Sequence, residues 1–271
     1  MTGIRLSRPD DLGDLRKVWS ASFPGDEAFA DWFLKTAYAP ENALVWVEGG
    51  RASAMLHLIP MRCRMPGREI RAAYVYAVAT LPENRGKGVA AALLKEAESL
   101  ERSRGTDMLM LVPQSDTLFE YYRRQGFLEA LFRGHGLITG AGEIPQGIVL
   151  DNAPQPAELN ACFEAVLSGR SHVARTDAHW ARSLTYLSAL GARRDGRLMG
   201  YAVYDAEGVV RELIAPDGDV RAALEAGVLK RLGVHEAVAY GPDGSPEPYG
   251  MARAITEGFE PEPFYAGLMM D

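Results

Sequence analysis

The sequence predicts an α/β protein built from two similar halves, and three observations lead to this prediction. Between residues 72 and 104, a strand-forming run, a glycine-bearing loop and a helix-forming segment follow one another. A similar order of strands and helices recurs about 144, 146 and 132 residues further along the chain, as in an internal repeat. The length of 271 residues also leaves room for two domains.

The loop between the first strand and the first helix of this segment has the features of a ligand-binding loop. Residues 72–81 are rich in β-branched, aromatic and small residues, and Pro82 closes this strand. The loop reads RGKGVA over residues 85–90, and good helix formers follow it. Glycines at a helix N-terminus form a nest of backbone N–H groups, which favours phosphate oxygens. We therefore expect a phosphorylated ligand here, although an ordinary glycine turn remains the alternative.

Two common phosphate-binding motifs are excluded. A Walker A loop needs an upstream glycine and a trailing Lys-Ser/Thr, and the Gly86-Lys87-Gly88 segment has neither. The dinucleotide fingerprint GxGxxG needs a third glycine, but Ala91 stands there and no acidic ribose partner follows at a suitable distance.

The residues after the loop extend the pattern. An apolar run over residues 108–112 predicts a buried strand, and Ser115 or Asp116 is the expected N-cap of the next helix. That helix covers about residues 118–125 and ends at Gly126, which Phe127 follows.

Three motifs in this order resemble the GCN5-related N-acetyltransferases (GNAT family) over about residues 4–137: the loop at 81–90, Ser115 seven residues before Tyr122, and Tyr122-Arg-Arg-Gln-Gly-Phe127. The resemblance implies a mixed, mostly antiparallel central sheet flanked by helices, with acetyl-CoA as cosubstrate and no metal. It also implies an acyl transfer in which Tyr122 protonates the leaving thiolate as general acid. A core role is the alternative for Tyr122, although Tyr121 suits that role better. The residues implied to bind acetyl-CoA are Val78, Ala79, Thr80, Arg85, Gly86, Lys87, Gly88, Val89, Ala90 and Ser115.

Two positions depart from the family pattern. The family often has Asn where this chain has Ser115, whose hydroxyl has a shorter reach. Many members carry a glutamate base four residues before the Thr80 position, but Tyr76 stands there and residues 72–81 hold no carboxylate. The base would then be a water chain, His57 or a group from the second half. A lone strand histidine is more often structural.

The second half looks like a degenerate copy. It has Pro216-Asp-Gly-Asp-Val-Arg where the first has the basic loop, and acids at a phosphate nest repel anions. Gly258 would match Gly126, which puts Ala254 at the position of Tyr122. We therefore predict a catalytic GNAT domain over residues 1–140 and a degenerate GNAT-like domain over 145–271. This tandem plan loosely resembles the Eis group of aminoglycoside-acetylating enzymes, without their third domain.

The acceptor is less well defined by the sequence. An acidic and aromatic segment over residues 23–32 suits an ammonium group. The favoured alternative is that Phe29, Trp32 and Phe33 form the core stripe of an amphipathic helix. A C-terminal strand over residues 264–271 could bring a carboxylate to the site.

Composition sets further bounds. A content of 47% hydrophobic residues allows a substantial core in each half. The net charge of −7 argues against nucleic-acid binding. Cys63 and Cys162 lack metal-ligand spacing and are expected to be reduced thiols. No signal peptide or membrane span is expected, which predicts a cytoplasmic protein.

Together these features predict an acetyl-CoA-dependent N-acetyltransferase that acylates the primary amine of a small molecule or peptide by direct transfer, with one active site in the first half. Nucleic acid and membranes are not expected partners, and a homo-oligomer stays open. The alternatives are an acyl-CoA-binding regulatory or scaffold protein, a transferase of another acyl group, or transfer to an oxygen acceptor.

Overall fold

The predicted order of strand, loop, helix, strand and helix is present in the computed structural model, which describes residues 2–140 and 142–269. The α-helices are α1 (Leu12–Ser22), α2 (Glu27–Thr36), α3 (Val89–Ser103), α4 (Asp116–Arg124), α5 (Pro156–Val166), α6 (Asp177–Ser183) and α7 (Gly218–Leu232). The strands are β1 (Gly3–Leu6), β2 (Ala43–Glu48), β3 (Arg51–Met65), β4 (Arg68–Thr80), β5 (Met108–Leu111), β6 (Leu128–Thr139), β7 (Ile148–Asp151), β8 (His172–Ala174), β9 (Ser188–Arg194), β10 (Arg197–Tyr204), β11 (Val210–Ile214), β12 (Glu236–Gly241), β13 (Ser245–Ala254) and β14 (Phe264–Tyr265).

The chain forms two compact units whose sequences interleave. The first unit consists of Met1–Met61, Ile70–Leu128 and Met251–Pro261. The second consists of Arg62–Glu69, Glu129–Gly250 and Glu262–Asp271. The predicted limits 1–140 and 145–271 follow the internal repeat instead, and they remain a prediction.

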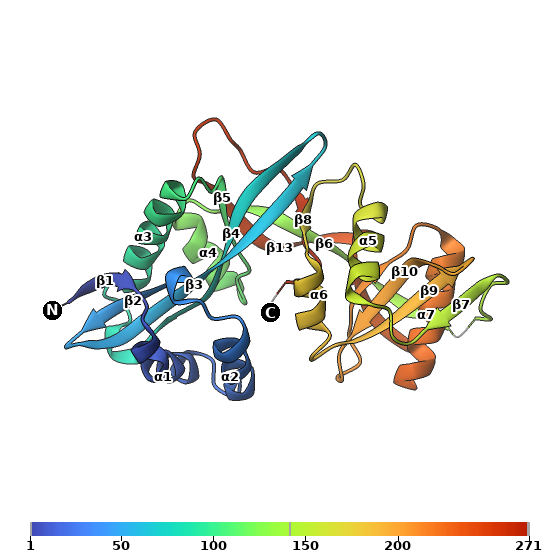
Figure 1. Ribbon diagram of the computed structural model, residues 1–271, viewed down its shortest axis with the longest axis horizontal. Helices are drawn as coiled ribbons and strands as arrows, with labels where there is room; N and C mark the ends of the chain where they lie inside the picture. The colour runs from blue at the N-terminus through green and yellow to red at the C-terminus, as the bar shows by residue number, and fades with distance from the viewer. Residues whose placement is uncertain (1, 141, 270–271) are drawn as a thin grey trace. The chain divides into compact units, whose positions relative to one another are not determined.

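The first unit contains a mixed sheet. Its strands β1, β2, β3, β4 and β5 are neighbours in that order, with β1–β2 and β2–β3 antiparallel and β4–β5 parallel. Figure 1 shows α1 and α2 on one side of β3 and β4, and α3 and α4 on the other. Apolar residues of α3, such as Leu93 and Ala97, are fully buried against strand residues such as Leu56 and Leu109. The predicted amphipathic stripe of α3 therefore covers one face of this sheet.

The second unit repeats this arrangement. Strands β9–β10 and β10–β11 are antiparallel, and β11–β12 is parallel, with α7 as the connection between the parallel strands. In the first unit α3 connects the parallel pair β4–β5 in the same way. The predicted fold class, α/β with mixed and mostly antiparallel sheets flanked by helices, is confirmed.

Each unit takes one strand from the other half of the sequence. In the first unit, the end of β13 pairs with β5 over four residues, from Met251 opposite Leu111 to Ala254 opposite Met108. Met251 and Ile255 are buried in the core of that unit. In the second unit, β6 pairs with β12 over six residues, and Ile138 is buried in the core there. The two halves therefore exchange strands reciprocally.

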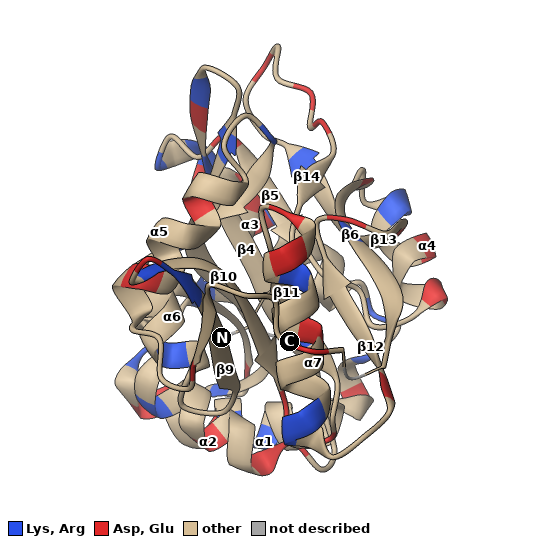
Figure 2. Ribbon diagram, turned by 90° about the vertical axis from the view of Figure 1, so that its right-hand side faces the viewer, with Lys and Arg blue, Asp and Glu red and all other residues tan. Residues whose placement is uncertain are grey.

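The surface is mixed in charge. Acidic and basic residues are interspersed along the elements (Figure 2). Among the residues that the structure describes, no helix is long and apolar enough to cross a membrane. The expected C-terminal strand is present only as β14, and the acid of Asp271 lies outside the described residues.

Candidate active site

The end of β4 is bulged and separates from β5. Its pairing with β5 covers Ala72 to Tyr74, whereas β4 itself continues to Thr80. Val75 and Val78 both pack into the same core cluster, although strict alternation would place them on opposite faces. Ala77 between them has a φ of 48°, a left-handed conformation that is uncommon for alanine. One extra residue is therefore inserted at this point, and the edge of β4 that faces β5 is open beyond it.

The phosphate-nest prediction concerns the loop that follows this open edge. Gly86 and Gly88 have φ values of 75° and 78°, which suit glycine alone without strain. Gly88 is the N-cap of α3, no side chain caps this helix, and its first turn carries no acid. Residues 85–88 are all exposed. The first amides of α3 are therefore available to an anion.

The two basic side chains of the loop have partners within the first unit. Arg85 Nε donates to the Thr80 carbonyl at 2.9 Å, and Nη2 donates to the Ala21 carbonyl at 3.0 Å. Lys87 Nζ donates to Asn84 Oδ1 at 2.9 Å, and the buried Asn84 side chain donates to Ser53. Arg85 thus joins the loop to the ends of β4 and α1, and the loop is held in place before any ligand arrives.

Ser115 and Tyr122 lie at opposite ends of α4. Ser115 is the N-cap, and its hydroxyl accepts from the Leu118 amide at 3.4 Å, as one of the two expected caps. Tyr122 is only 6% exposed and packs edge-on against Phe127. Burial, and to a lesser degree the neighbouring Tyr121, raises the pKa of Tyr122 well above its ordinary value. Its phenol is therefore protonated at neutral pH, as a general acid requires.

His57, the candidate base, is a core residue. It is 2% exposed, and its ring lies 4.9 Å from Phe33 and 6.2 Å from Trp19, centroid to centroid. Burial lowers the pKa of His57 to about 3. Phe33 is fully buried as the favoured core interpretation of α2 expects, whereas Phe29 and Trp32 are half-buried.

In the second unit, charged side chains occupy the N-terminus of α7 and strand β11, which correspond to the N-terminus of α3 and strand β4. Asp217 caps α7 by accepting from the Val220 amide at 2.9 Å and also pairs with Arg194 at 3.0 Å. Its carboxylate therefore stands where a phosphate would need to bind. On β11, Glu212 is fully buried; burial alone would raise its pKa, but Arg175 keeps it below the ordinary value. Two Arg175 nitrogens donate to it at 2.5 and 2.7 Å.

The match of Gly258 with Gly126 is wrong. Gly126 follows helix α4, but Gly258 follows strand β13, in which Ala254 is the last residue. In the described part of the chain, no helix lies between β12 and β13. The second half therefore lacks the whole counterpart of α4, and Ala254 does not replace Tyr122.

The bulge at Ala77 is not predicted from the sequence. Residues 72–80 look like one uninterrupted strand, and alanine gives no signal for a left-handed conformation. Only the spacing of the apolar residues offered a hint, because Val75 and Val78 differ by three positions rather than two or four.

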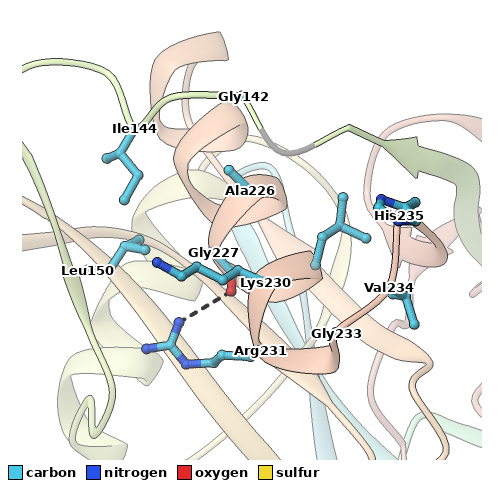
Figure 3. Close-up of a pocket in the computed structure, with 11 residues that line it drawn as sticks. Gly142, Ile144, Leu150, Ala226, Gly227, Lys230, Arg231, Gly233, Val234 and His235 are labelled. Atoms are coloured by element: carbon cyan, nitrogen blue, oxygen red, sulfur yellow. Dashed lines mark hydrogen bonds between the residues drawn. The ribbon is translucent and has the colours of Figure 1, made fainter.

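A groove elsewhere does not coincide with these residues. It lies in the second unit at the C-terminal end of α7 and has a volume of about 680 Å³. Figure 3 shows Lys230, Arg231, His235 and Ile144 around it, with Arg231 donating to the Gly227 carbonyl at 3.3 Å. None of the predicted site residues lines it. Among the described residues, no group of His, Cys, Asp and Glu is arranged to hold a metal ion.

The family follows from a comparison with known domains. Residues 3–130 match the family described as an acetyltransferase (GNAT) domain. The chain carries a GNAT acetyltransferase domain. This match covers the bulged β4, the open loop and α4, and it ends at residue 130, within β6. The family assignment and the candidate site therefore fall on the same segment. A search of curated protein sequences finds no match to this chain.

Solved structures share the fold over nearly the whole chain. A GCN5-related N-acetyltransferase from Anabaena variabilis has a TM-score of 0.77 at 16% identity, with 94% of this chain and 73% of that chain covered. Eis1 from Mycobacterium abscessus has a TM-score of 0.70 at 18% identity, covering 94% and 74%. A tandem GNAT protein from the clavulanic acid biosynthesis pathway has a TM-score of 0.57 at 14% identity, covering 96% and 100%. The GNAT-like arrangement thus extends through both halves.

Proposed function

We propose that the protein is an acetyl-CoA-dependent N-acetyltransferase with one active site, in its GNAT domain. The observation that carries this proposal is the uncapped N-terminus of α3, which follows directly on the open edge of β4. At the corresponding helix of the second unit, α7, Asp217 caps the N-terminus itself, so those amides are not free to hold a pyrophosphate.

The residues of the first unit fit acetyl-CoA, which supplies a thioester as acyl donor. The amides of residues 86–90 would hold its pyrophosphate, and backbone groups of Val78, Ala79 and Thr80 would align its arm along the open edge of β4. An amide of this strand would also donate to the thioester oxygen as negative charge develops there. Tyr122 would hold a proton for the sulfur, and Ser115 would contribute its hydroxyl only by sharing it with the Leu118 amide.

The acceptor in this proposal is a primary amine on a small molecule or peptide. We also propose a cytoplasmic location. An acyl-CoA-binding regulator would use the same loop without turnover. Tyr122 favours the enzyme, because a regulator has no need of a proton donor beside the thioester.

Substitution of Gly88 tests the phosphate site. A carboxylate at the N-cap of α3 reproduces the situation at Asp217, so Gly88→Asp is expected to weaken acetyl-CoA binding at least ~10-fold by calorimetric titration. Gly88→Asn is the matched control, since it has nearly the same shape, tolerates a left-handed φ and carries no charge. Asn should retain most of the affinity.

A second control is Asp217→Asn in the second unit, which should leave acetyl-CoA affinity unchanged. Equal affinity of Gly88→Asp and Gly88→Asn would show that this loop does not hold the pyrophosphate.

A further inference from the structure

The guanidinium of Arg85 connects two elements that come before it in the chain. Its Nε donates to the Thr80 carbonyl at the end of β4, at 2.9 Å. Its Nη2 donates to the Ala21 carbonyl in the last turn of α1, at 3.0 Å, and to the Ser22 hydroxyl at 3.4 Å. Since the two shorter contacts go to backbone carbonyls, Arg85 holds the ends of the two elements themselves.

The end of α1 needs such a partner from outside the helix. The last four carbonyls of a helix accept no hydrogen bond from within it, and the helix dipole favours a cation beside them. Residues 19–22, the last turn of α1, read Trp-Ser-Ala-Ser and include no basic side chain. Arg85 supplies the cation from 64 positions further along the chain and so caps α1.

The Thr80 carbonyl belongs to the open edge of β4. The amide of the next residue, Leu81, donates to the Ser53 carbonyl of β3. Backbone groups of successive strand residues point to opposite sides, so those of Thr80 point away from β3. That side is the open edge along which the arm of the acyl donor would lie. Arg85 therefore holds a backbone group of the strand edge on which the proposed reaction depends.

A second contact attaches the same turn of α1 to β4. Trp19 lies in this turn, and its ring is 6.0 Å from that of Tyr76, centroid to centroid. Tyr76 comes immediately before the bulge at Ala77, whereas the Arg85 contact comes after it. The end of α1 is thus attached to β4 on both sides of the bulge, and a shift of either contact would change the course of the open edge.

The second unit shows that the fold itself does not need this connection. There, only residues 215–216 separate the end of β11 from Asp217, the N-cap of α7. In the first unit, residues 81–87 separate the end of β4 from Gly88, the N-cap of α3. The equivalent strand and helix can therefore be joined without the segment that carries Arg85. The longer connection occurs in the unit that has the uncapped helix N-terminus.

We propose that the Arg85 side chain is a positioning residue, which holds the open edge of β4 in the orientation that acyl transfer requires and does not bind a phosphate of the donor. This inference rests on the proposed function and adds a role within the same site. The amides of residues 86–90 would hold the pyrophosphate, while Arg85 would determine how the thioester lies. A misplacement of about 1 Å can lower a reaction rate by about 10²-fold.

Two substitutions separate positioning from phosphate binding. Arg85→Lys keeps the positive charge and Arg85→Gln removes it, and neither side chain has the forked donor geometry of a guanidinium. Calorimetry should show CoA affinities within about threefold of the unmodified protein in both variants, whereas kcat for thiol release from acetyl-CoA, with water as the acceptor, should fall at least ~10-fold in both.

A phosphate ligand would give a different pattern, because a charge would then be enough. In that case Arg85→Gln would lose CoA affinity by at least ~10-fold and Arg85→Lys would retain it. This result would overturn the proposal, and so would an unchanged kcat in both variants.

Hydrogen exchange measures the connection itself. Without the Arg85 cap, the amides of residues 20–23 should exchange at least ~5-fold faster in both variants. Because Arg85 is exposed, the melting temperature should fall by only a few degrees, and failure of both variants to fold would contradict the inference. Ser22→Ala is the matched control, since it removes only the longest contact, and it should leave exchange, CoA affinity and kcat within about twofold. Unchanged exchange in both Arg85 variants would show that Arg85 does not hold α1.

The unmodified protein separates this inference from the proposed function. If it does not bind CoA, the proposed function fails and this inference fails with it. If it binds CoA but releases no thiol from acetyl-CoA, the acyl-CoA-binding regulator is favoured and the positioning role fails. If it binds and turns over acetyl-CoA while kcat is unchanged in both Arg85 variants, the proposed function holds and only the positioning role fails.

Discussion

Tyr121 and Tyr122 are adjacent in sequence, but their surroundings differ. The sequence predicts Tyr121 as the better core residue, but Tyr122 is the buried one, beside Phe127. Tyr121 is half-buried against the same core cluster. The predicted catalytic residue is therefore also a core residue through its ring. The ring is the part that packs against Phe127, and the hydroxyl is the part that the proposed reaction requires.

Removal of that hydroxyl is expected to separate catalysis from stability. Tyr122→Phe should lower kcat for acetyl transfer by roughly 10²- to 10⁴-fold, because the leaving thiolate loses its proton donor. Acetyl-CoA affinity and melting temperature should change little. Tyr121→Phe is the matched control, and it should leave kcat within about twofold. A Tyr122→Phe variant with unchanged kcat would contradict the general-acid role.

His57 predicts a dependence of stability on pH. Its pKa is about 3 in the folded chain because of burial, against about 6.5 when unfolded. The unfolded chain therefore takes up a proton first as the pH falls, so the histidine destabilises the fold below pH 6.5. Between pH 7.5 and pH 5 this amounts to about 2 kcal/mol.

His57→Phe keeps an aromatic ring and removes the titration. Its free energy of unfolding, measured with urea at both pH values, should fall about 2 kcal/mol less than that of the unmodified protein over this interval. An identical pH dependence in both proteins would show that His57 is not held neutral.

At the scale of the elements, the basic loop could be found from sequence but the bulge could not. Residues 85–90 carry a signal, since glycines directly before a helix N-terminus form a nest of backbone N–H groups. Ala77 carries none, because its left-handed conformation is imposed by the packing of Val75 and Val78 on one face of the sheet. The false match of Gly258 has a similar origin. A Gly-Phe pair can follow a strand as well as a helix, and sequence alone did not distinguish the two.

The bulge makes Ala77 sensitive to side-chain shape. A left-handed φ costs roughly 1–2 kcal/mol for an ordinary residue and more for a β-branched one. Alanine already bears the ordinary cost, so Ala77→Val should lower the free energy of unfolding by the excess for a β-branched residue, about 1 kcal/mol or more, and also weaken acetyl-CoA binding. Ala77→Gly should keep both stability, within about 1 kcal/mol, and binding. Chemical denaturation and calorimetry measure these changes, and a neutral Ala77→Val variant would contradict the assigned backbone conformation.

At the scale of the whole molecule, the repeat predicted two domains in sequence order, whereas the strands are exchanged. Repeated segments show which elements correspond, but not which copy of a strand completes which sheet. The pairing of β13 with β5 brings Met251 into a core more than 130 residues distant in the chain, as the register of Met251 with Leu111 shows. Local patterns contain no information on such pairing.

The exchange predicts that the first half does not fold alone. A fragment of residues 1–140 would lack the strand that pairs with β5 and would expose that edge. It should therefore show no cooperative thermal unfolding by circular dichroism. Production together with a fragment of residues 141–271 should restore it. Cooperative unfolding and full acetyl-CoA affinity of the first fragment alone would refute this expectation.

The strand exchange also limits the evolutionary changes that such a protein can tolerate. A duplicated half that has lost its ligand would ordinarily be free to disappear by deletion. Here deletion of the second half would remove β13 from the core of the first, and loss of the first would remove β6 from the second. If the chemistry lies in the first unit as proposed, the second half can change by substitution but not by deletion, because the core of the first unit includes part of β13.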